Sequence, residues 1–307
     1  GLFLCLKVSF TGKPLDISFF PPMIITWQNI SNRRSLPVQT AMGTIKLLRY
    51  PGGKQRLAKY ILPLIPKNIK GIYVEPFLGS GAIFFALNPQ KALLSDVNQD
   101  LVDVYIGVKR SPQRVWEIYS RFPRDKQSYY NIRNLEIKND DLSYRAARWL
   151  YLNRNCFNGV WRQNSKGKFN SGYGGSDRIP GLTKKDIEDA SNRLEKAKIM
   201  CSDFEPIIDN SEEDDFIFCD PPYKPHSKEL IQSLYFGSFH FNEYKRLARS
   251  LERASNRGTR WLLTISSHQD ILNLFNKNRV IKMSNGTGQK LGILDKSPGE
   301  AIILNYY

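Results

Sequence analysis

The four residues Asp220-Pro221-Pro222-Tyr223 bring together a carboxylate, two prolines and an aromatic ring. Asp220 and the carbonyl of Pro221 can accept hydrogen bonds from the two N–H groups of an exocyclic amine such as that of adenine, and Tyr223 can stack on the base. These bonds localise the nitrogen lone pair for in-line attack on the methyl group of a sulfonium donor, so catalysis would be mainly positioning and charge placement. If the tetrapeptide stood alone, the structural alternative would be favoured, in which Asp220 is a strand-end cap or turn residue and Tyr223 is a packing residue.

The elements around this tetrapeptide predict where it lies. The apolar run Phe216–Cys219 before it reads as a buried strand, and the two prolines force the chain to leave the sheet at that point. Ligands of open α/β sheets bind at the carboxyl edge of the strands. We therefore expect the tetrapeptide to form a rigid polar rim at this edge, and a base in duplex DNA would have to flip out of the helix to reach it.

A glycine-rich turn follows an earlier strand. Residues 72–75 read as a strand, 76–81 as the turn and 82–87 as the start of a helix, which is a strand–loop–helix unit of the nucleotide-binding kind. Phe84 stands at the third glycine position of a dinucleotide fingerprint, and no Gly-Lys-Ser/Thr follows as in a P-loop. A second strand, 92–95, ends at Asp96, which is well placed to accept hydrogen bonds from a ribose diol. Capping of the next helix by Asn98 and Asp100 is the structural alternative for this acidic cluster.

Two weaker signals accompany the glycine-rich turn. Tyr50-Pro51-Gly52-Gly53-Lys54 lets the backbone approach a ligand closely beside a lysine, although for this motif alone an ordinary turn before a helix is the better explanation. Asp203-Phe204 follows the strand 199–201 and offers an acceptor and an apolar face. From residue 186 onward strands and helices alternate, with further strands expected at 216–219, 261–266, 280–283 and 301–306. The fold class expected is α/β, a mostly parallel sheet with one insertion between its second and third strands.

The expected insertion, residues 99–185, is strongly basic. It holds 17 Lys/Arg against 8 Asp/Glu, so more than half of the chain's net charge of +16 falls in it. Within it, residues 151–170 interleave basic, amide and aromatic side chains, and Ser165-Lys166-Gly167 reads as a hairpin turn. Such a ribbon can enter a DNA groove, with Arg and Asn reading base edges and an aromatic wedging between bases. A solvated polar hairpin is the alternative.

Composition narrows the class of protein further. A net charge of +16 over 307 residues favours a polyanionic partner, although a solvated basic surface would also produce it. Four scattered cysteines without C-x-x-C spacing argue against a disulfide framework or a zinc site and fit a reducing cytosol; with only three histidines we expect no metal. No apolar run approaches the roughly 18–20 residues that span a bilayer.

The expected domain organisation has three parts. We expect residues 42–98 and 186–307 to form the catalytic domain and residues 99–185 an inserted, mainly helical domain that carries a β-hairpin. Residues 1–41 mix short apolar pieces with four prolines, and we expect them to be an upstream extension outside both parts.

Taken together and in order, the motifs resemble those of the Dam-like family of DNA adenine-N6 methyltransferases. The similarity runs from about Leu47 to the C-terminus, and the motifs that carry it are Tyr50-Pro51-Gly52-Gly53-Lys54, Glu75-Pro76-Phe77-Leu78-Gly79-Ser80-Gly81, Ser95-Asp96-Val97-Asn98, Tyr151-Leu152-Asn153-Arg154, Phe157-Asn158-Gly159 and Phe218-Cys219-Asp220-Pro221-Pro222-Tyr223. The resemblance implies a Rossmann-like methyltransferase fold that uses S-adenosylmethionine and acts on double-stranded DNA.

The resemblance also implies roles for single residues. Asp96 would hold the cofactor ribose and Asp203-Phe204 would bracket its adenine, while Asp220 and Tyr223 would hold the target base. The expected cofactor residues are Tyr50, Gly53, Lys54, Phe77, Gly79, Gly81, Asp96, Asp203, Phe204 and Asp220, the expected catalytic residues Asp220, Pro221, Pro222 and Tyr223, and the expected DNA-binding residues Arg154, Phe157, Asn158, Arg162, Lys166 and Lys168.

Well-studied members of the family read the palindrome GATC. Here Val160 and Trp161 follow the Asn-Gly, and residues 171–179 depart from the family pattern, so the recognition sequence stays open. A cognate restriction endonuclease is a candidate partner, and we expect a monomer. No Pro-Cys dipeptide is present, which argues against cytosine-C5 methylation. A catalytically inactive DNA-binding protein on the same fold and an RNA adenine methyltransferase remain as alternatives.

Overall fold

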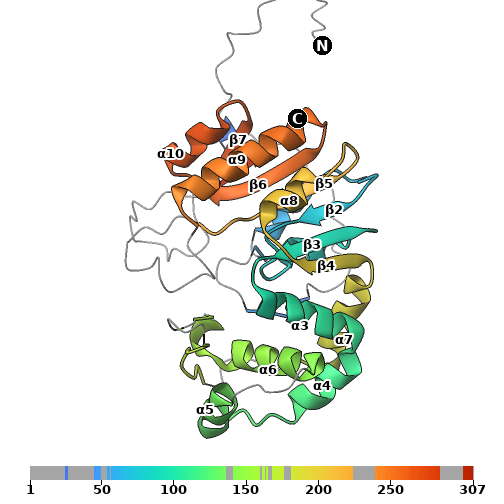
Figure 1. Cartoon of the computed structure of the whole chain (residues 1–307), viewed down its shortest axis with the longest axis vertical. Coiled ribbons are helices and arrows are strands. Elements are labelled where there is room, and N and C mark those ends of the chain that lie inside the picture. The colour runs from blue at the N-terminus through green and yellow to red at the C-terminus, as the bar shows by residue number, and fades with distance from the viewer. Residues whose placement is uncertain are drawn as a thin grey trace, which may run out of the picture.

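A mostly parallel sheet of eight strands lies at the centre of the chain (Figure 1). The computed structural model describes residues 25–26, 45–49, 54–55, 57–135, 141–159, 161–162, 164, 168–175, 181–223, 239–283 and 300–306. The strands are β1 (Ile25–Thr26), β2 (Tyr73–Glu75), β3 (Ala92–Asp96), β4 (Ala197–Cys201), β5 (Phe216–Cys219), β6 (Arg260–Ser266), β7 (Arg279–Met283) and β8 (Glu300–Leu304).

The order of the strands places a ligand crevice at the middle of the sheet. The order is β1-β7-β8-β6-β5-β2-β3-β4, and β8 alone runs antiparallel to its neighbours β6 and β7. From β2 the chain builds outward through β3 and β4, and then returns to add β5 and β6 on the other side. Such a reversal creates a crevice at the carboxyl edge, between β2 and β5. The predicted Rossmann-like fold class is therefore confirmed.

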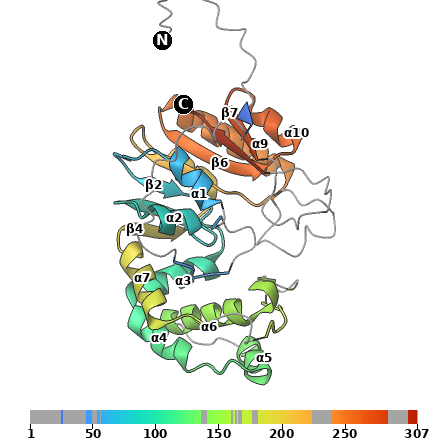
Figure 2. The ribbon, with the colours of Figure 1, turned by 180° about the vertical axis from the view of Figure 1, so that it is seen from behind.

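Helices cover both faces of the sheet. Figure 2 shows α1 and α2 over one face, and Figure 1 shows α8, α9 and α10 over the other. The helices are α1 (Ala58–Ile61), α2 (Ala82–Leu87), α3 (Gln99–Arg110), α4 (Pro112–Ser120), α5 (Lys126–Asn134), α6 (Leu142–Asn155), α7 (Lys184–Leu194), α8 (Phe204–Asp209), α9 (Phe241–Asn256) and α10 (Gln269–Leu272), with 3₁₀ turns at Leu62–Leu64, Phe157–Gly159 and Asn273–Phe275.

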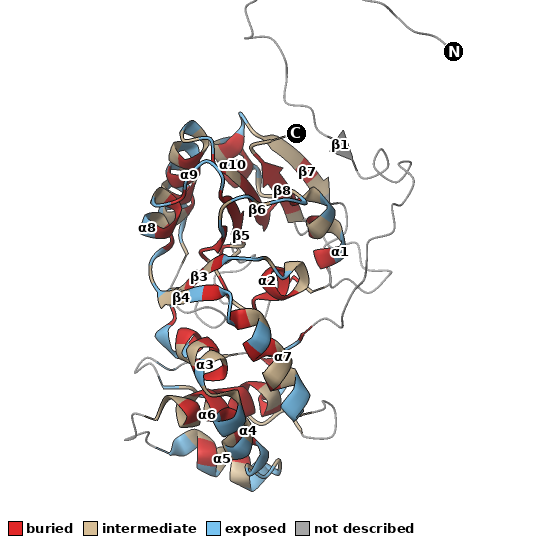
Figure 3. Ribbon diagram, turned by 90° about the vertical axis from the view of Figure 1, so that its right-hand side faces the viewer, coloured by how far each residue is buried: buried red, intermediate tan, exposed pale blue. Residues whose placement is uncertain are grey.

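Alternation along the buried strands builds two apolar cores. In β5, Phe216 and Phe218 join the core on the α2 side, whereas Ile217 and Cys219 join the core beneath α8 and α9. Figure 3 shows buried residues concentrated on the central strands. Because both faces are covered, β5 carries no polar side chain until Asp220, which is why the polar rim begins where the strand ends.

Helices α3 to α7 gather below the sheet in Figure 1, between β3 and β4 in the sequence. Helix α3 packs against β4 as well as against α6 and α7. At Gly107 of α3, an added Cβ would lie 2.7 Å from the Cβ of Ala146 in α6, so these two helices pack closely. The boundary at residues 99 and 185 remains a prediction, because α3 touches the sheet and the helices alike.

The predicted ribbon of residues 151–170 is wrong in its first part. Tyr151–Asn155 forms the end of α6, because Ala147, Leu150 and Tyr151 continue a buried helical face. Backbone pairing begins where α6 ends: Phe157 N–H donates to the Gly172 carbonyl and Gly174 N–H to the Asn155 carbonyl, at 2.8 Å each, and Cys156 and Tyr173 form an antiparallel bridge. Farther along, Asn170 N–H donates to the Arg162 carbonyl and Asn164 N–H to the Lys168 carbonyl, at 2.9 Å each. The predicted turn at 165–167 lies outside the described residues.

Strand β1 adds two residues to the edge beside β7, in parallel register. The hypothesis that residues 1–41 are an extension outside the fold stays a prediction. Among the helices of the described residues, none is long and apolar enough to span a bilayer.

Candidate active site and nucleic-acid interface

Asp220 begins the polar rim at the end of β5. Its Oδ1 lies 2.9 Å from the ammonium of Lys54 and accepts a hydrogen bond of 2.6 Å from the hydroxyl of Thr264 in β6. Tyr244 of α9 donates to the carbonyl of Pro222 at 2.6 Å and so fixes the second proline. The structure therefore brings Asp220 together with the lysine of the Gly-Gly-Lys motif, which lies more than 160 positions earlier in the chain.

Lys54 and Tyr223 lie side by side at this rim. Lys54 is 4% exposed, and its Nζ lies 4.4 Å from the centroid of the Tyr223 ring, within the range of a cation–π contact. Glu300, the first residue of β8, lies near enough to both for the charge of Lys54 and the side chain of Tyr223 to act on its carboxyl group. Burial raises the pKa of Glu300. Acidic, basic and aromatic groups from four separate segments thus share one small region.

The glycine-rich turn crosses the carboxyl end of β2 in a fixed conformation. Gly79 and Gly81 have φ values of 47° and 63°, in the left-handed region that side chains disfavour. Gly79 is held from both sides, because its N–H donates to Asp96 at 3.0 Å and its carbonyl accepts from the Tyr105 hydroxyl at 2.8 Å. A turn held in this way can present its backbone to a ligand without first becoming ordered.

Asp96 closes β3 beside this turn. Its Oδ2 accepts from Gly79 N–H and its Oδ1 from Asn98 N–H, both at 3.0 Å, so the carboxylate braces the turn. Burial raises the pKa of Asp96, and those backbone hydrogen bonds act in the opposite direction. The structural alternative is also partly right: the Asn98 side chain accepts from Leu101 N–H and caps α3.

Glu75 is a buried carboxyl group in the motif of residues 75–81, and no role was predicted for it from the sequence. It is 2% exposed at the end of β2, and its Oε2 accepts from the Tyr73 hydroxyl at 2.7 Å. Burial, with a smaller contribution from the negative charge of Asp220, raises the pKa of Glu75 to about 8, although the hydrogen bond from Tyr73 acts in the opposite direction. The sequence did contain a signal that Glu75 is special, since its carboxyl group stands in an otherwise apolar strand. Burying such a group costs free energy unless it is paired and hydrogen-bonded.

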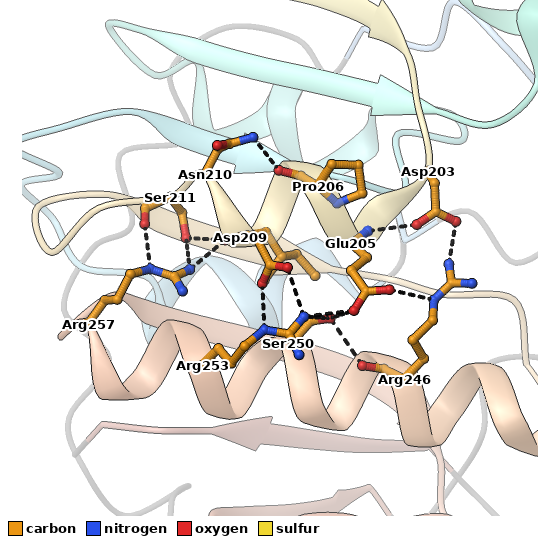
Figure 4. Close-up of polar contacts among 11 residues, drawn as sticks. Asp203, Glu205, Pro206, Asp209, Asn210, Ser211, Arg246, Ser250, Arg253 and Arg257 are labelled. Carbon is orange, nitrogen blue, oxygen red and sulfur yellow. Dashed lines mark hydrogen bonds and ion pairs between the residues drawn. The ribbon is translucent and has the colours of Figure 1, made fainter.

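Asp203 and Phe204 sit at the end of β4, where Asp203 caps α8 by accepting from Glu205 N–H at 2.9 Å. Arg246 of α9 pairs with Asp203 (Figure 4). Its guanidinium also lies 4.3 Å from the centroid of the Phe204 ring. Phe204 stacks on Phe77 of the glycine-rich turn, with ring centroids 5.2 Å apart. Phe77 and Phe204, expected from sequence to be near the cofactor, are thus in direct contact.

A ladder of ion pairs ties α8 to α9 below these residues (Figure 4). Arg246 contacts Glu205 at 3.1 Å, and Arg253 reaches both Glu205 at 2.7 Å and Asp209 at 2.8 Å. Arg257 donates to carbonyl groups at the end of α8, 2.7 Å from Ile208 O. The role of these arginines was not predicted from the sequence. Their spacing along α9 could have indicated that they share one face of the helix.

On the helical side, the structure separates the predicted DNA-binding residues. Phe157 is 59% exposed on the 3₁₀ turn after α6, and Arg162 and Lys168 are also exposed. Arg154, in contrast, donates from its guanidinium to the carbonyls of Lys46 and Leu47. Arg154 therefore joins α6 to the segment before Lys54 and does not lie on the hairpin with Arg162 and Lys168.

Some predicted residues cannot be placed. Tyr50, Gly53 and Lys166 lie outside the described residues, as does the side chain of Asn158. Over the ranges that are described, no group of three or more His, Cys, Asp or Glu side chains is arranged to hold a metal ion.

Thr264 and Glu300 are the members of the site that sequence reasoning assigned no role. Each sits on a strand neighbouring the polar rim only because of the strand order, which no local pattern reveals. The aromatic ring of Phe239 also lies at this site, 5.8 Å from Phe77 between ring centroids.

Comparison with known proteins shows the family to which the sequence is similar. Residues 50–286 match the family described as D12 class N6 adenine-specific DNA methyltransferase. A DNA N-6-adenine-methyltransferase of Escherichia phage P1 is 36% identical over 75% of this chain, which spans only 31% of that protein. The Type II methyltransferase M.MjaIII of Methanocaldococcus jannaschii is 32% identical over 84% of this chain and 98% of its own length. A DNA adenine methylase of Vibrio cholerae is 32% identical over 79% of this chain and 91% of that protein.

Proposed function

Because this chain belongs to the D12 class N6 adenine-specific DNA methyltransferases, we propose that it transfers a methyl group from S-adenosylmethionine to N6 of a flipped adenine in duplex DNA. The observation that carries the proposal is the contact between Asp220 and Lys54 at the carboxyl edge. It joins the proposed base-binding rim to the Gly-Gly-Lys segment, beside the crevice where α/β sheets bind nucleotides.

The residues around the crevice suit this cofactor. The rigid turn of Gly79 and Gly81 provides close backbone approach, Asp96 provides a carboxylate at the ribose position of the fold, and Phe77 and Phe204 provide apolar faces for an adenine ring. When bound there, the cofactor supplies an electrophilic methyl group on sulfur and leaves as a neutral thioether.

The residues of the rim prepare the acceptor. Asp220 and the Pro221 carbonyl accept the two N–H groups of the adenine amine, which turns its lone pair toward the crevice. Tyr223 stacks on the base with the ring face opposite Lys54. As the new N–C bond forms, positive charge develops on N6 beside Asp220, and the amine then releases a proton to water. Electrostatic placement of this kind is the main source of rate acceleration.

The helical part of the chain delivers the DNA in this proposal. Phe157 projects from the turn after α6 as the wedge that fills the place of the flipped base, and Arg162 and Lys168 contact the duplex from the hairpin. We propose a GATC-type palindrome as the first target, on the strength of the family resemblance. The Type II names of M.MjaIII and similar relatives suggest a restriction endonuclease as a partner of the same recognition sequence.

The test uses S-adenosylmethionine labelled in its methyl group. The full chain is incubated with unmethylated duplex DNA containing GATC, with the same duplex lacking adenine at that site, and with an RNA duplex. We expect label in N6-methyladenine of the first duplex, identified after digestion to nucleosides. Transfer to RNA alone would favour the RNA adenine methyltransferase. No transfer while cofactor and DNA both bind would favour the catalytically inactive DNA-binding protein.

A further inference from the structure

The hydroxyl of Thr264 is buried against the proposed catalytic carboxylate. Thr264 lies in the middle of β6 and is 1% exposed. Its neighbour Leu263 is in register with Cys219, and Thr264 itself is paired with Ile302 of β8 on the other side. Two strand ladders therefore fix its backbone, and the β-branched side chain has little χ1 freedom, so the position of its Oγ1 is set before any substrate binds.

The hydroxyl has two acceptors within reach, and the distances separate them. Oγ1 lies 2.6 Å from Oδ1 of Asp220 but 3.4 Å from the carbonyl oxygen of Cys219. Hydrogen bonds to a charged acceptor are shorter and about twice as strong as neutral ones. The carboxylate is thus the principal partner, and satisfaction of a buried hydroxyl by the nearest backbone carbonyl does not account for the geometry.

Lys54 contacts the same oxygen. Its Nζ lies 2.9 Å from Oδ1, so an ammonium and a hydroxyl converge on one of the two carboxylate oxygens. An oxygen that already accepts two strong hydrogen bonds is the poorer acceptor for a third. The two donors also come from different directions, one from the segment before α1 and one from β6, and together they fix the plane of the carboxylate.

We infer that Thr264 is a positioning residue, which with Lys54 holds Oδ1 so that Oδ2 of Asp220 accepts the N–H of the target amine. This inference rests on the proposed function and names the oxygen that takes part. The lysine has a flexible stem and can shift when a base enters beside Tyr223. The threonine cannot, so it keeps the carboxylate oriented through the reaction.

The experiment compares four variants in single-turnover methyl transfer to an unmethylated GATC duplex. Thr264→Val removes the hydroxyl at nearly constant shape, and Thr264→Ser keeps it. Thr259→Val is the matched control, since Thr259 is also fully buried and its hydroxyl bonds to the Glu212 carbonyl at 2.9 Å, away from the rim. Thr264→Ala, paired with Thr264→Ser, repeats the comparison without the γ-methyl group if the valine variant does not fold.

For Thr264→Val we expect the transfer rate to fall by about tenfold or more, as for a lost hydrogen bond to a charged group, while the Kd for S-adenosylmethionine changes by less than about twofold. Thr264→Ser should stay within about threefold of the unaltered chain, and Thr259→Val should transfer at its full rate. The inference would be overturned if Thr264→Val transferred methyl groups at the rate of the unaltered chain. It would also be overturned if Thr264→Ser lost as much of the transfer rate as Thr264→Val or Thr264→Ala. Absence of adenine methylation by the unaltered chain would instead overturn the proposed function.

Discussion

Asp220 is the residue on which the proposed chemistry depends most directly. We expect Asp220→Ala to reduce methyl transfer by at least about a thousandfold, because the amine loses an acceptor and its developing charge loses a partner. The variant leaves Lys54 buried without its 2.9 Å contact, so cofactor binding should be measured in parallel by calorimetry, and we expect it to persist.

Asp214→Ala is the control for that change, since Asp214 is an exposed aspartate, with a side chain 64% accessible. It should behave as the unaltered chain does in both measurements. Turnover near the normal rate in Asp220→Ala would contradict the assigned role.

Glu75 makes a prediction about pH. Its pKa is about 8 in the folded chain against 4.5 for a solvated glutamate, so the folded state holds this proton more tightly than the unfolded state. Stability from this group is fully present below pH 4.5 and is lost as the pH rises through about 8. Glu75→Gln cannot ionise and should not show this loss.

The measurement is urea unfolding of both chains at pH 5.5, 7.0 and 8.5. We expect the stability of Glu75→Gln relative to the unaltered chain to rise with pH, by no more than about 1.4 kcal/mol per pH unit. Glu195→Gln, at an exposed position, serves as the control. A difference between Glu75→Gln and the unaltered chain that stays constant with pH would contradict the assignment.

At this scale, sequence predicts residue types better than contacts. Asp220 and Lys54 belong to recognisable motifs, so both were expected near the site. The 2.9 Å contact between them was not predicted. Thr264 and Glu300 were assigned no role because a single buried hydroxyl or carboxyl in a strand resembles any other. Their proximity to Asp220 and Tyr223 follows from which strands are neighbours, and that is a property of the folded sheet.

The hairpin after α6 is the element whose placement matters most for DNA. Trp161 lies between Trp149 of α6 and Phe169 of the returning strand, with ring centroids 4.2 Å apart in both pairs. This stack attaches the hairpin to the helix. Backbone hydrogen bonds of 2.8 Å also join residues 172 and 174 to the end of α6 and the turn after it. Beyond them, Trp161 and Phe169 are the large apolar groups among the described residues 161–170, so the position of this part depends on the stack.

Trp161→Ala should therefore weaken DNA binding by about an order of magnitude and leave S-adenosylmethionine binding unchanged. Fluorescence anisotropy with a labelled duplex measures the first and calorimetry the second. Trp116→Ala is the matched control, because Trp116 is a half-buried tryptophan of α4 that packs on Tyr119 with centroids 6.0 Å apart. Equal losses in the two variants would show that the effect is general destabilisation.

Elements bounded by sharp signals were predicted well, and the others less so. Residues 82–87 and 216–219 were expected as a helix and a strand with the bounds that the structure has, because glycine or proline ends each pattern. Residues 151–155 were assigned to a ribbon on composition, yet their burial has helical period and prolongs α6. Helix α8 was missed because a six-residue helix that begins at an aspartate cap resembles a loop.

Over the whole molecule, charge is distributed unevenly. Residues 99–185 hold more than half of the net +16, while the carboxylates of α8 are paired with arginines of α9. The helical side is thus the side that attracts a polyanion. Binding to DNA should weaken steeply between 50 and 200 mM salt, because bound lysines and arginines displace counterions.

Lys168→Ala should lower the slope of log Kd against log salt by about one, as expected for the loss of one phosphate contact. Anisotropy titrations at four salt concentrations measure this slope. Lys277→Ala removes an equally exposed lysine that pairs with Glu252 on α9, far from the helical side, and should leave the slope unchanged. A slope near zero for the unaltered chain would argue against DNA contact through residues 99–185.

The place of β8 has a consequence for the order in which the chain becomes active during synthesis. Helices α3 to α7 are complete by residue 194, whereas β6 and β7 leave a gap that only residues 300–304 can fill. A nascent chain on the ribosome can therefore assemble its basic helices while the rim still lacks Glu300 and one flank of Thr264. In the proposed function, translation thus finishes the part expected to hold DNA before the part expected to modify it, and we expect a prematurely terminated chain to occupy DNA without methylating it.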